Sequence, residues 1–514
     1  MLPVVGVSAL GVLAGLLAIT VSDLEAKFAI AAVIVLAGLV GSLMLGQRGK
    51  MAALVAVFVF GISIKLNKTF FLLETSQWQY VPFAGGAAGV TVGANDIAAA
   101  LLLIAAMRRR SSEAPSLLWI LVSGPLLFMA AGLASLHNAG DRSLVVFELW
   151  RQALLLLSMV AAMNLSSEQL RIALRALAIS VVVQGAIACV QYVTDANLGL
   201  GFFGEQDLVQ EEIGFQIQAR AVGTIGHSNI LSYFFELTLP LMLTLLLTVR
   251  GFGARLPYLA ALGAGLAGVL VTLSRAAWIA VPVTLVPVFL YFYGRQLLRL
   301  RSAVYGIGLA IVGSVTLALA WPTISERLFS DDSGSLDARA PLNEAALSVI
   351  EQFPAFGVGL NNLGNAFPLF DRTQNARILG PINHVVHNLY LLVMAEVGIV
   401  GFLAFLWSLG GALLVGWWLR RSPDPLARAI GVGGAAGLIA HMIHGLFDPG
   451  FKLSLPVSTM IAVQTGLIGA AWLRHRRALA AAAPQVAPAP VGGEIDYRAR
   501  LRPRRAMSRA SAFR

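Results

Sequence analysis

The chain has 514 residues, of which 58% are hydrophobic and only 12% are charged, and its mean hydropathy is +0.79. These values lie far outside the range of soluble globular proteins and indicate a polytopic membrane protein. The net charge of +11 does not indicate nucleic-acid binding, because the basic residues gather in short connections and in the C-terminal tail. We therefore expect contacts with anionic membrane lipids and none with nucleic acid.

Fourteen apolar segments have lengths near the roughly 20 residues that cross a bilayer as a helix. In chain order they are residues 3–20, 28–46, 51–65, 94–107, 117–136, 146–163, 171–193, 229–249, 256–273, 276–293, 303–321, 387–419, 428–446 and 454–473. The third and fourth are short and the twelfth is long. The sequence thus predicts an all-α fold of about fourteen transmembrane helices.

Basic residues alternate from one connection to the next, as expected when lysine and arginine remain in the cytoplasm. With the N-terminus inside, the basic connections on the cytoplasmic side are 47–50, 107–113, 166–175, 250–255, 294–302, 420–428 and 473–477. The opposite side receives 22–27, 66–93, 137–142, 194–228, 274–275, 322–386 and 448–452. Both termini are therefore predicted to be cytoplasmic, with the long connections outside.

Three regions follow from this pattern. Residues 1–136 form N-terminal transmembrane helices, residues 137–473 form a second membrane domain that includes the outer loop 322–386, and residues 474–514 form a basic tail. The tail begins with an Ala/Pro-rich stretch that is too poor in core-forming residues to fold, so we expect it to be disordered. The single cysteine, Cys189, excludes a disulfide within the chain.

The outer loop 322–386 is long enough to suggest a function. Pro341 and Glu344 suit the first turn of a helix, and Pro354 ends it. Arg339 stands just before this predicted helix, where its guanidinium and the free backbone N–H groups can bind an anion.

His387 stands where the chain leaves that loop and enters the twelfth span, followed by Asn388. On one continuous helix Gly398 and Gly401 would lie nearly beneath His387, which predicts close helix packing there. The positive end of a helix disfavours the imidazolium form. A neutral imidazole in this position suits a general base.

The spacing of His387, Asn388, Gly398 and Gly401 resembles the H-[N/S/Q]-x9-G-x2-G pattern of the O-antigen ligase family. That family also contains O-antigen polymerases and bacterial protein O-oligosaccharyltransferases. RAVGTIGHSN (220–229), LSRAAW (273–278) and the segment from Arg339 through PAFGVGLNN resemble other parts of the family in the same order. The resemblance covers roughly residues 140–450 and implies a GT-C-like membrane fold in the bacterial inner membrane.

This resemblance implies transfer of a glycan from an undecaprenyl-diphosphate carrier to an acceptor hydroxyl on the periplasmic face, without a metal or another cofactor. His387 would be the base, and Arg220 and Arg339 would bind the diphosphate, so that a single displacement inverts the anomeric centre. Further contacts with the substrates are expected from Arg275, His227, Asn229, Asn388, His384 and Asp448. His227 and Asn229 either orient Arg220 or cap the eighth span.

The sequence does not distinguish between three classes of acceptor for the glycan. Ligases act on lipid A-core, polymerases on a growing glycan, and protein glycosylases on serine or threonine. The additional N-terminal spans favour a capsular, exopolysaccharide or O-antigen polymerase over a lipopolysaccharide ligase.

Other interpretations compete with these roles. His387 could cap a helix at the lipid interface, and the three arginines could be ordinary loop residues. The spacing of His384 and His387 suits a metal, but no third ligand stands nearby. His441, His444 and Asp448 recur on one helical face, where they could hold a metal or an acceptor or pair with a neighbouring helix.

Three alternative functions compete with metal-free glycan transfer, namely metal-dependent glycan transfer, transport and a structural scaffold. Asp23 and Glu25 in the first outer loop have the spacing with which other membrane glycosyltransferases hold a divalent metal. A polysaccharide or lipid transporter is expected to carry an internal repeat and buried charges within its spans, and the sequence shows neither clearly. A scaffold would tolerate replacement of His387, Arg220 and Arg339.

Overall fold

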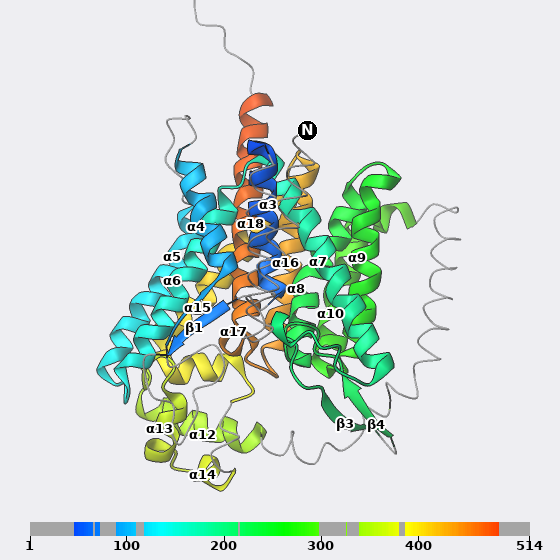
Figure 1. Cartoon of the computed structure of the whole chain (residues 1–514). Helices are drawn as coiled ribbons and strands as arrows, with labels where there is room; N and C mark the ends of the chain where they lie inside the picture. Colours follow the sequence, from blue (N-terminus) through cyan, green and yellow to red (C-terminus); the bar gives the residue numbers. More distant parts are fainter. Residues whose placement is uncertain are drawn as a thin grey trace, which may run out of the picture.

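The computed structural model describes residues 46–64, 67–71, 89–108, 118–213, 216–297, 325, 339–379 and 386–482. Within these residues, nine helices are long and apolar enough to cross a membrane. They are α5 (Trp119–Ala134) with the 3-10 turn η3 (Ser135–His137), α6 (Arg142–Met163), α7 (Ser167–Thr194), α8 (Ser228–Thr248), α9 (Phe252–Val271), α10 (Arg275–Leu297), α15 (Leu389–Leu419), α16 (Pro425–His444) and α18 (Leu455–Ala482). They run side by side in one bundle (Figure 1).

The prediction of a mostly helical, polytopic membrane protein is confirmed. The nine helices coincide with the fifth to tenth and the twelfth to fourteenth predicted spans. The short third and fourth segments form α3 (Gln47–Ser63) and α4 (Ala94–Met107). The first, second and eleventh predicted spans, with Asp23 and Glu25, lie outside the described residues, as do the loop 322–338 apart from Ser325 and most of the basic tail.

α8 forms the centre of the bundle, since 89% of its most apolar stretch is buried. It packs against α16 through glycines whose missing side chains let the two backbones approach. A Cβ atom added at Gly437 would lie 2.3 Å from the carbonyl oxygen of Leu237, and one added at Gly433 would lie 2.3 Å from Oγ1 of Thr244. This close contact holds the ends of α8 and α16 next to each other.

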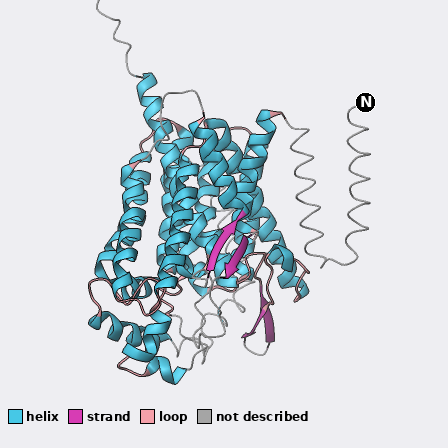
Figure 2. Ribbon diagram, turned by 60° about the vertical axis from the view of Figure 1, so that its left-hand side comes forward, coloured by secondary structure: helices cyan, strands magenta, loops and turns pink. Residues whose placement is uncertain are grey.

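Two antiparallel hairpins accompany the helices and were not predicted from the sequence. β1 (Asn67–Phe71) pairs with β2 (Gly89–Gly93), and β3 (Val209–Ile213) pairs with β4 (Gln216–Arg220). Figure 2 shows both as separate two-stranded ribbons. The register of the second hairpin pairs Val209 with Arg220, so β4 ends on Arg220 at the edge of the bundle.

Connections that were predicted to share a side of the membrane lie at the same end of the bundle. Arg474 binds the Asp424 carboxylate at 2.8 Å and donates to the Ser167 hydroxyl at 2.7 Å, which joins three basic connections. At the other end the backbone N–H of Leu389 donates to the carbonyl of Gly445 at 2.8 Å. The alternation of the charged connections therefore agrees with the arrangement of the helices.

A layer of short helices covers this second end, and we call it the outer layer. It comprises α12 (Arg339–Gln352), α13 (Leu363–Phe370) and α14 (Asn375–Leu379), which lie below the bundle in Figure 1. α12 confirms the helix predicted between Pro341 and Pro354. The layer has its own apolar core, to which α12 contributes Leu342 and Val349, α13 contributes Phe367 and the start of α15 contributes Leu392.

α15 is kinked, and the expectation of one continuous helix after His387 is wrong. Gly398 has φ of 63° and ψ of −171°, so the helix breaks there into two parts. The first part runs across the lower end of the bundle in Figure 1 and packs on the outer layer. The freed backbone groups are satisfied by the outer layer, because Ile399 N–H donates to the carbonyl of Pro354 at 2.8 Å and Val358 N–H donates to that of Ala395 at 3.0 Å.

Candidate active site

His387 lies at the start of α15, where the outer layer meets the bundle. The next residue, Asn388, caps the helix by accepting hydrogen bonds from the backbone N–H groups of Tyr390 and Leu391. The Nδ1 atom of His387 is buried and lies 3.8 Å from Oδ2 of Asp448. The side chain as a whole is 35% exposed, so part of it is open to solvent although Nδ1 is buried.

Asp448 follows the last turn of α16, and its side chain is only 7% exposed. Its Oδ2 accepts a hydrogen bond from Nδ2 of Asn229 at 3.1 Å, and its backbone carbonyl accepts one from the Tyr233 hydroxyl. Burial alone would raise the pKa of this carboxyl, but the interactions with His387, His444 and Asn229 outweigh it and hold the pKa below its usual range. The carboxylate beside the imidazole is therefore ionised at neutral pH.

Arg220 reaches the same group from the end of β4. Its Nη2 donates to Oδ1 of Asn229 at 2.6 Å, and its Nε donates to the carbonyl of Thr272 at 3.0 Å. Asn229 thus joins Arg220 to Asp448, and Asp448 faces His387. We call Arg220, Asn229, Asp448 and His387 the outer polar chain. It links three separate parts of the sequence, namely the segment 220–229, His387 and Asp448.

The other predicted site residues lie around this chain at different distances. His227 caps α8, since its Nδ1 accepts a hydrogen bond from the backbone N–H of Asn229 at 3.2 Å. Asn229 orients Arg220 by accepting its hydrogen bond. The two residues therefore have different roles. Arg275 is the first residue of α10 and follows Thr272 closely. Arg339 is the first residue of α12, and within the described residues no hydrogen bond or ion pair joins it to the outer polar chain. His384 lies outside the described residues.

The two predicted packing glycines have different surroundings from those expected on a straight helix. A Cβ atom added at Gly398 would lie 2.3 Å from the backbone of Ala355 in the outer layer, and one added at Gly401 would lie 3.2 Å from Cβ of Ala131 in α5. Gly398 therefore faces the outer layer and Gly401 faces the bundle.

His441 and His444 lie deeper, within α16. Nδ1 of His444 lies 2.7 Å from Oε1 of Glu236 in α8, and both side chains are almost fully buried. The Tyr233 ring stacks on His444 at 3.9 Å between centroids. The expected pairing of these histidines with a neighbouring helix is therefore correct for His444. Across the described parts of the chain, no group of three His, Cys, Asp or Glu side chains is arranged to hold a metal ion.

Four buried charges form a second polar group that we call the buried charge cluster. Arg151 binds both carboxylate oxygens of Glu148, with distances of 2.9 and 2.5 Å. Lys452 lies 3.5 Å from Glu148 and 2.8 Å from Glu396. Two cations balance two anions, and each side chain is 5% exposed or less. The cluster ties α6 to the short helix α17 (Gly450–Leu453) and to the residues just before the kink of α15.

The sequence analysis missed this cluster, and its statement that the spans lack buried charges is wrong. One signal was available, because Glu148 and Arg151 are opposite charges one turn apart inside an apolar segment. The pairing of Lys452 with Glu396 could not be read from the sequence, since it depends on the kink of α15 and on the turn after α16.

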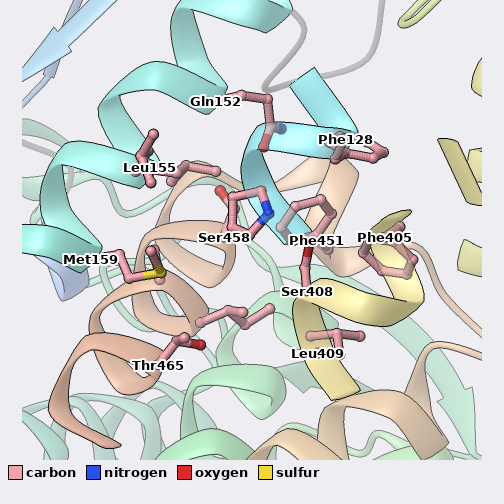
Figure 3. A pocket seen from close by; sticks show the side chains of 14 residues that line it. Phe128, Gln152, Leu155, Met159, Phe405, Ser408, Leu409, Phe451, Ser458 and Thr465 are labelled. Atoms are coloured by element: carbon pink, nitrogen blue, oxygen red, sulfur yellow. The ribbon is translucent and has the colours of Figure 1, made fainter. Parts of the chain in front are cut away.

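A small cavity of about 60 Å³ borders the buried charge cluster. Figure 3 shows that apolar side chains such as Leu155 and Met159 line it together with the polar side chains of Gln152, Ser408, Ser458 and Thr465. Sites for small molecules usually have volumes of about 300 Å³ or more. This cavity is too small for a sugar unit, so the outer polar chain is the better candidate for the substrate site.

The comparison with protein families supports placing the candidate active site at the outer polar chain. Residues 259–406 match the model of the O-antigen ligase family, a range that includes Arg275, Arg339 and His387 as well as the kink at Gly398. Arg220, Asn229 and Asp448 lie outside it, so only their contacts connect them to the site. No curated protein matches the chain. The match covers less than a third of the chain, and over this range the chain is similar to the O-antigen ligase and polymerase superfamily.

Proposed function

We propose that this protein transfers a glycan from an undecaprenyl-diphosphate carrier to an acceptor hydroxyl, with the outer polar chain as its active site. The observation that carries the proposal is the position of His387, which lies against the Asp448 carboxylate at 3.8 Å inside the range that matches the O-antigen ligase family. The outer polar chain lies at the end of the bundle that the charge pattern predicts to be periplasmic, where such carriers present their glycans. The protein would then act in the inner membrane.

His387 acts in this proposal as the general base. Its Nδ1 faces Asp448 and the exposed part of its ring is available for the acceptor hydroxyl. As the hydroxyl attacks the anomeric carbon, the imidazole takes its proton and becomes cationic. The nearby ionised carboxylate of Asp448 stabilises that charge and orients the ring. A positioned base of this kind typically contributes a factor of about 10² to 10⁴ in rate.

The arginines stabilise the departing diphosphate. Arg220 is held in place by Thr272 and Asn229, so little reorganisation is needed when negative charge develops on the leaving group. Arg275 and Arg339 add positive charge from the starts of α10 and α12, where helix N-termini also favour an anion. Bidentate guanidinium contacts suit phosphate oxygens. We propose that these groups make a metal ion unnecessary and that one displacement inverts the anomeric centre.

The test is reconstitution of the purified protein in liposomes with a defined undecaprenyl-diphosphate oligosaccharide. Lipid A-core, a second carrier-linked oligosaccharide and a serine-containing peptide are supplied as separate acceptors, with and without EDTA. The proposal predicts a product with inverted anomeric configuration by NMR, undiminished by EDTA. Retention of configuration, or loss of product with EDTA and its return with Mg²⁺, would contradict the mechanism. The acceptor that is glycosylated distinguishes a ligase, a polymerase and a protein O-oligosaccharyltransferase.

Transport is the second candidate, because buried charges within membrane spans often mark a transport pathway. The buried charge cluster is the observation that favours it. Its four side chains, however, are bound to one another with balanced charge, which suits a structural role. Movement of the labelled carrier across the liposome membrane without any glycan transfer would support transport and contradict the proposed enzyme.

A further inference from the structure

A second cavity lies at the end of the bundle opposite to the outer polar chain. It has a volume of about 300 Å³, which reaches the size of small-molecule sites. The starts of α7, α9 and α16 and the ends of α8 and α18 surround it. Its polar and charged lining consists of Arg171, Arg175, Thr248, Tyr258, Asp424 and Arg474.

Positive charge dominates this lining. Arg474 is already engaged, because it binds Asp424 at 2.8 Å and Ser167 at 2.7 Å. Arg171 and Arg175 stand one turn apart on α7 and are exposed, and within the described residues neither forms an ion pair. One carboxylate therefore faces three guanidinium groups, and two of these are available for an anion.

The other polar side chains of the cavity fit the same kind of ligand. The Thr248 hydroxyl is buried and has no hydrogen-bond partner among the described residues, and Tyr258 adds a phenol group from α9. Hydroxyl donors beside arginine are common partners of phosphate oxygens. The cavity thus offers a phosphate group two cations and two hydroxyl donors.

An apolar surface continues from the cavity along α9. Only 28% of the most apolar stretch of this helix is buried, and three large side chains near the cavity are exposed, namely Phe252, Leu256 and Leu259. A ligand that carries both a phosphate and hydrocarbon chains would contact both surfaces at once. A soluble phosphate compound would leave the apolar surface unused.

We propose that this cavity binds the headgroup of an anionic phospholipid, with the phosphate at Arg171 and Arg175 and the acyl chains along α9. This site is separate from the outer polar chain and does not depend on the proposed glycan transfer. Its predicted place at the cytoplasmic surface, where anionic lipids attract basic residues, agrees with the proposal.

The test compares two double variants of the full chain. Arg171→Gln/Arg175→Gln removes the two cavity charges. Arg476→Gln/Arg477→Gln is the matched control, because it removes two exposed arginines near the same end of the bundle that do not line the cavity. Binding of short-chain phosphatidylglycerol to the detergent-purified proteins is measured by native mass spectrometry, with phosphatidylcholine as the neutral lipid.

We expect the cavity variant to bind phosphatidylglycerol at least about tenfold more weakly than the wild type, and the control variant to stay within about twofold. Equal losses in both variants would show that the lipid responds only to general positive charge and would overturn the proposal. Inorganic phosphate is the third probe. If it displaced the lipid at equal concentration, the site would recognise phosphate alone, and the lipid assignment would be wrong.

Discussion

The Nδ1 atom of His387 lies 3.8 Å from Oδ2 of Asp448, although His387 precedes α15 and Asp448 follows α16. Asp448→Asn keeps the shape of this side chain but removes the charge that stabilises a protonated imidazole. We expect the rate of glycan transfer to fall by about 100-fold or more. Initial rates in liposomes at saturating donor measure the effect. Asp207→Asn makes the same change at an exposed loop residue and should leave the rate unchanged, and equal rates for the two variants would rule out a role for Asp448.

Asp448 also predicts how stability depends on pH. Its folded-state pKa is held below the usual value, because its interactions with His387, His444 and Asn229 outweigh the effect of burial. The unfolded chain therefore binds the proton first as the pH falls. The stabilisation is complete above about pH 4 and is lost as the pH drops through the folded pKa. Thermal unfolding between pH 6 and pH 3 should show a shallower decline for Asp448→Asn than for the wild type. Parallel curves would contradict the shift.

Lys452 holds together two carboxylates of the buried charge cluster. Lys452→Met leaves Glu396 and Glu148 without one cation in an apolar bundle, and breaking a buried ion pair in this way costs about 3–5 kcal/mol. We expect a large drop in thermal stability. Glu396→Gln/Lys452→Met removes one charge of each sign and should recover much of that loss. If the double variant were less stable than Lys452→Met, the ion pair would not be the cause.

Gly398 allows the kink in α15 because its backbone conformation is open almost only to glycine. Alanine there would meet the backbone of Ala355 at 2.3 Å and would also strain the backbone by about 1–3 kcal/mol. Gly398→Ala should therefore lower the unfolding temperature and the transfer rate together. Gly410→Ala is the matched control in the same helix, since a Cβ atom there meets nothing within 4 Å. Similar behaviour of both variants would show that the kink is not required.

Most of the helical bundle could be predicted from the sequence because each span carries its own signal. Hydrophobic length identifies a membrane helix, and basic residues such as Arg420 and Arg474 indicate which connections share a side. The same local information located His387 and Arg339 at helix starts, and the family pattern added Arg220. Asn229 and Asp448 were predicted near the substrate, but their hydrogen bond depends on how α8 packs on α16.

The parts that escaped prediction depend on contacts between distant segments. The kink at Gly398 exists because the outer layer bonds to the freed backbone of α15, so a helical projection through His387 and Gly401 could not show it. The two hairpins are short. No alternation of apolar residues marks β3, and the alternation in β4 includes only Ile217 and Ala219. The pairing of Lys452 with Glu396 follows from that same kink.

The central claim is that His387 removes the proton of the acceptor hydroxyl. It is tested most directly by the single-turnover rate of His387→Ala at saturating undecaprenyl-diphosphate oligosaccharide, with donor binding measured on the same sample. The account predicts a rate about 10² to 10⁴ times lower than that of the wild type, with donor affinity nearly unchanged. A variant that binds the donor normally and transfers the glycan at a rate close to that of the wild type would contradict it.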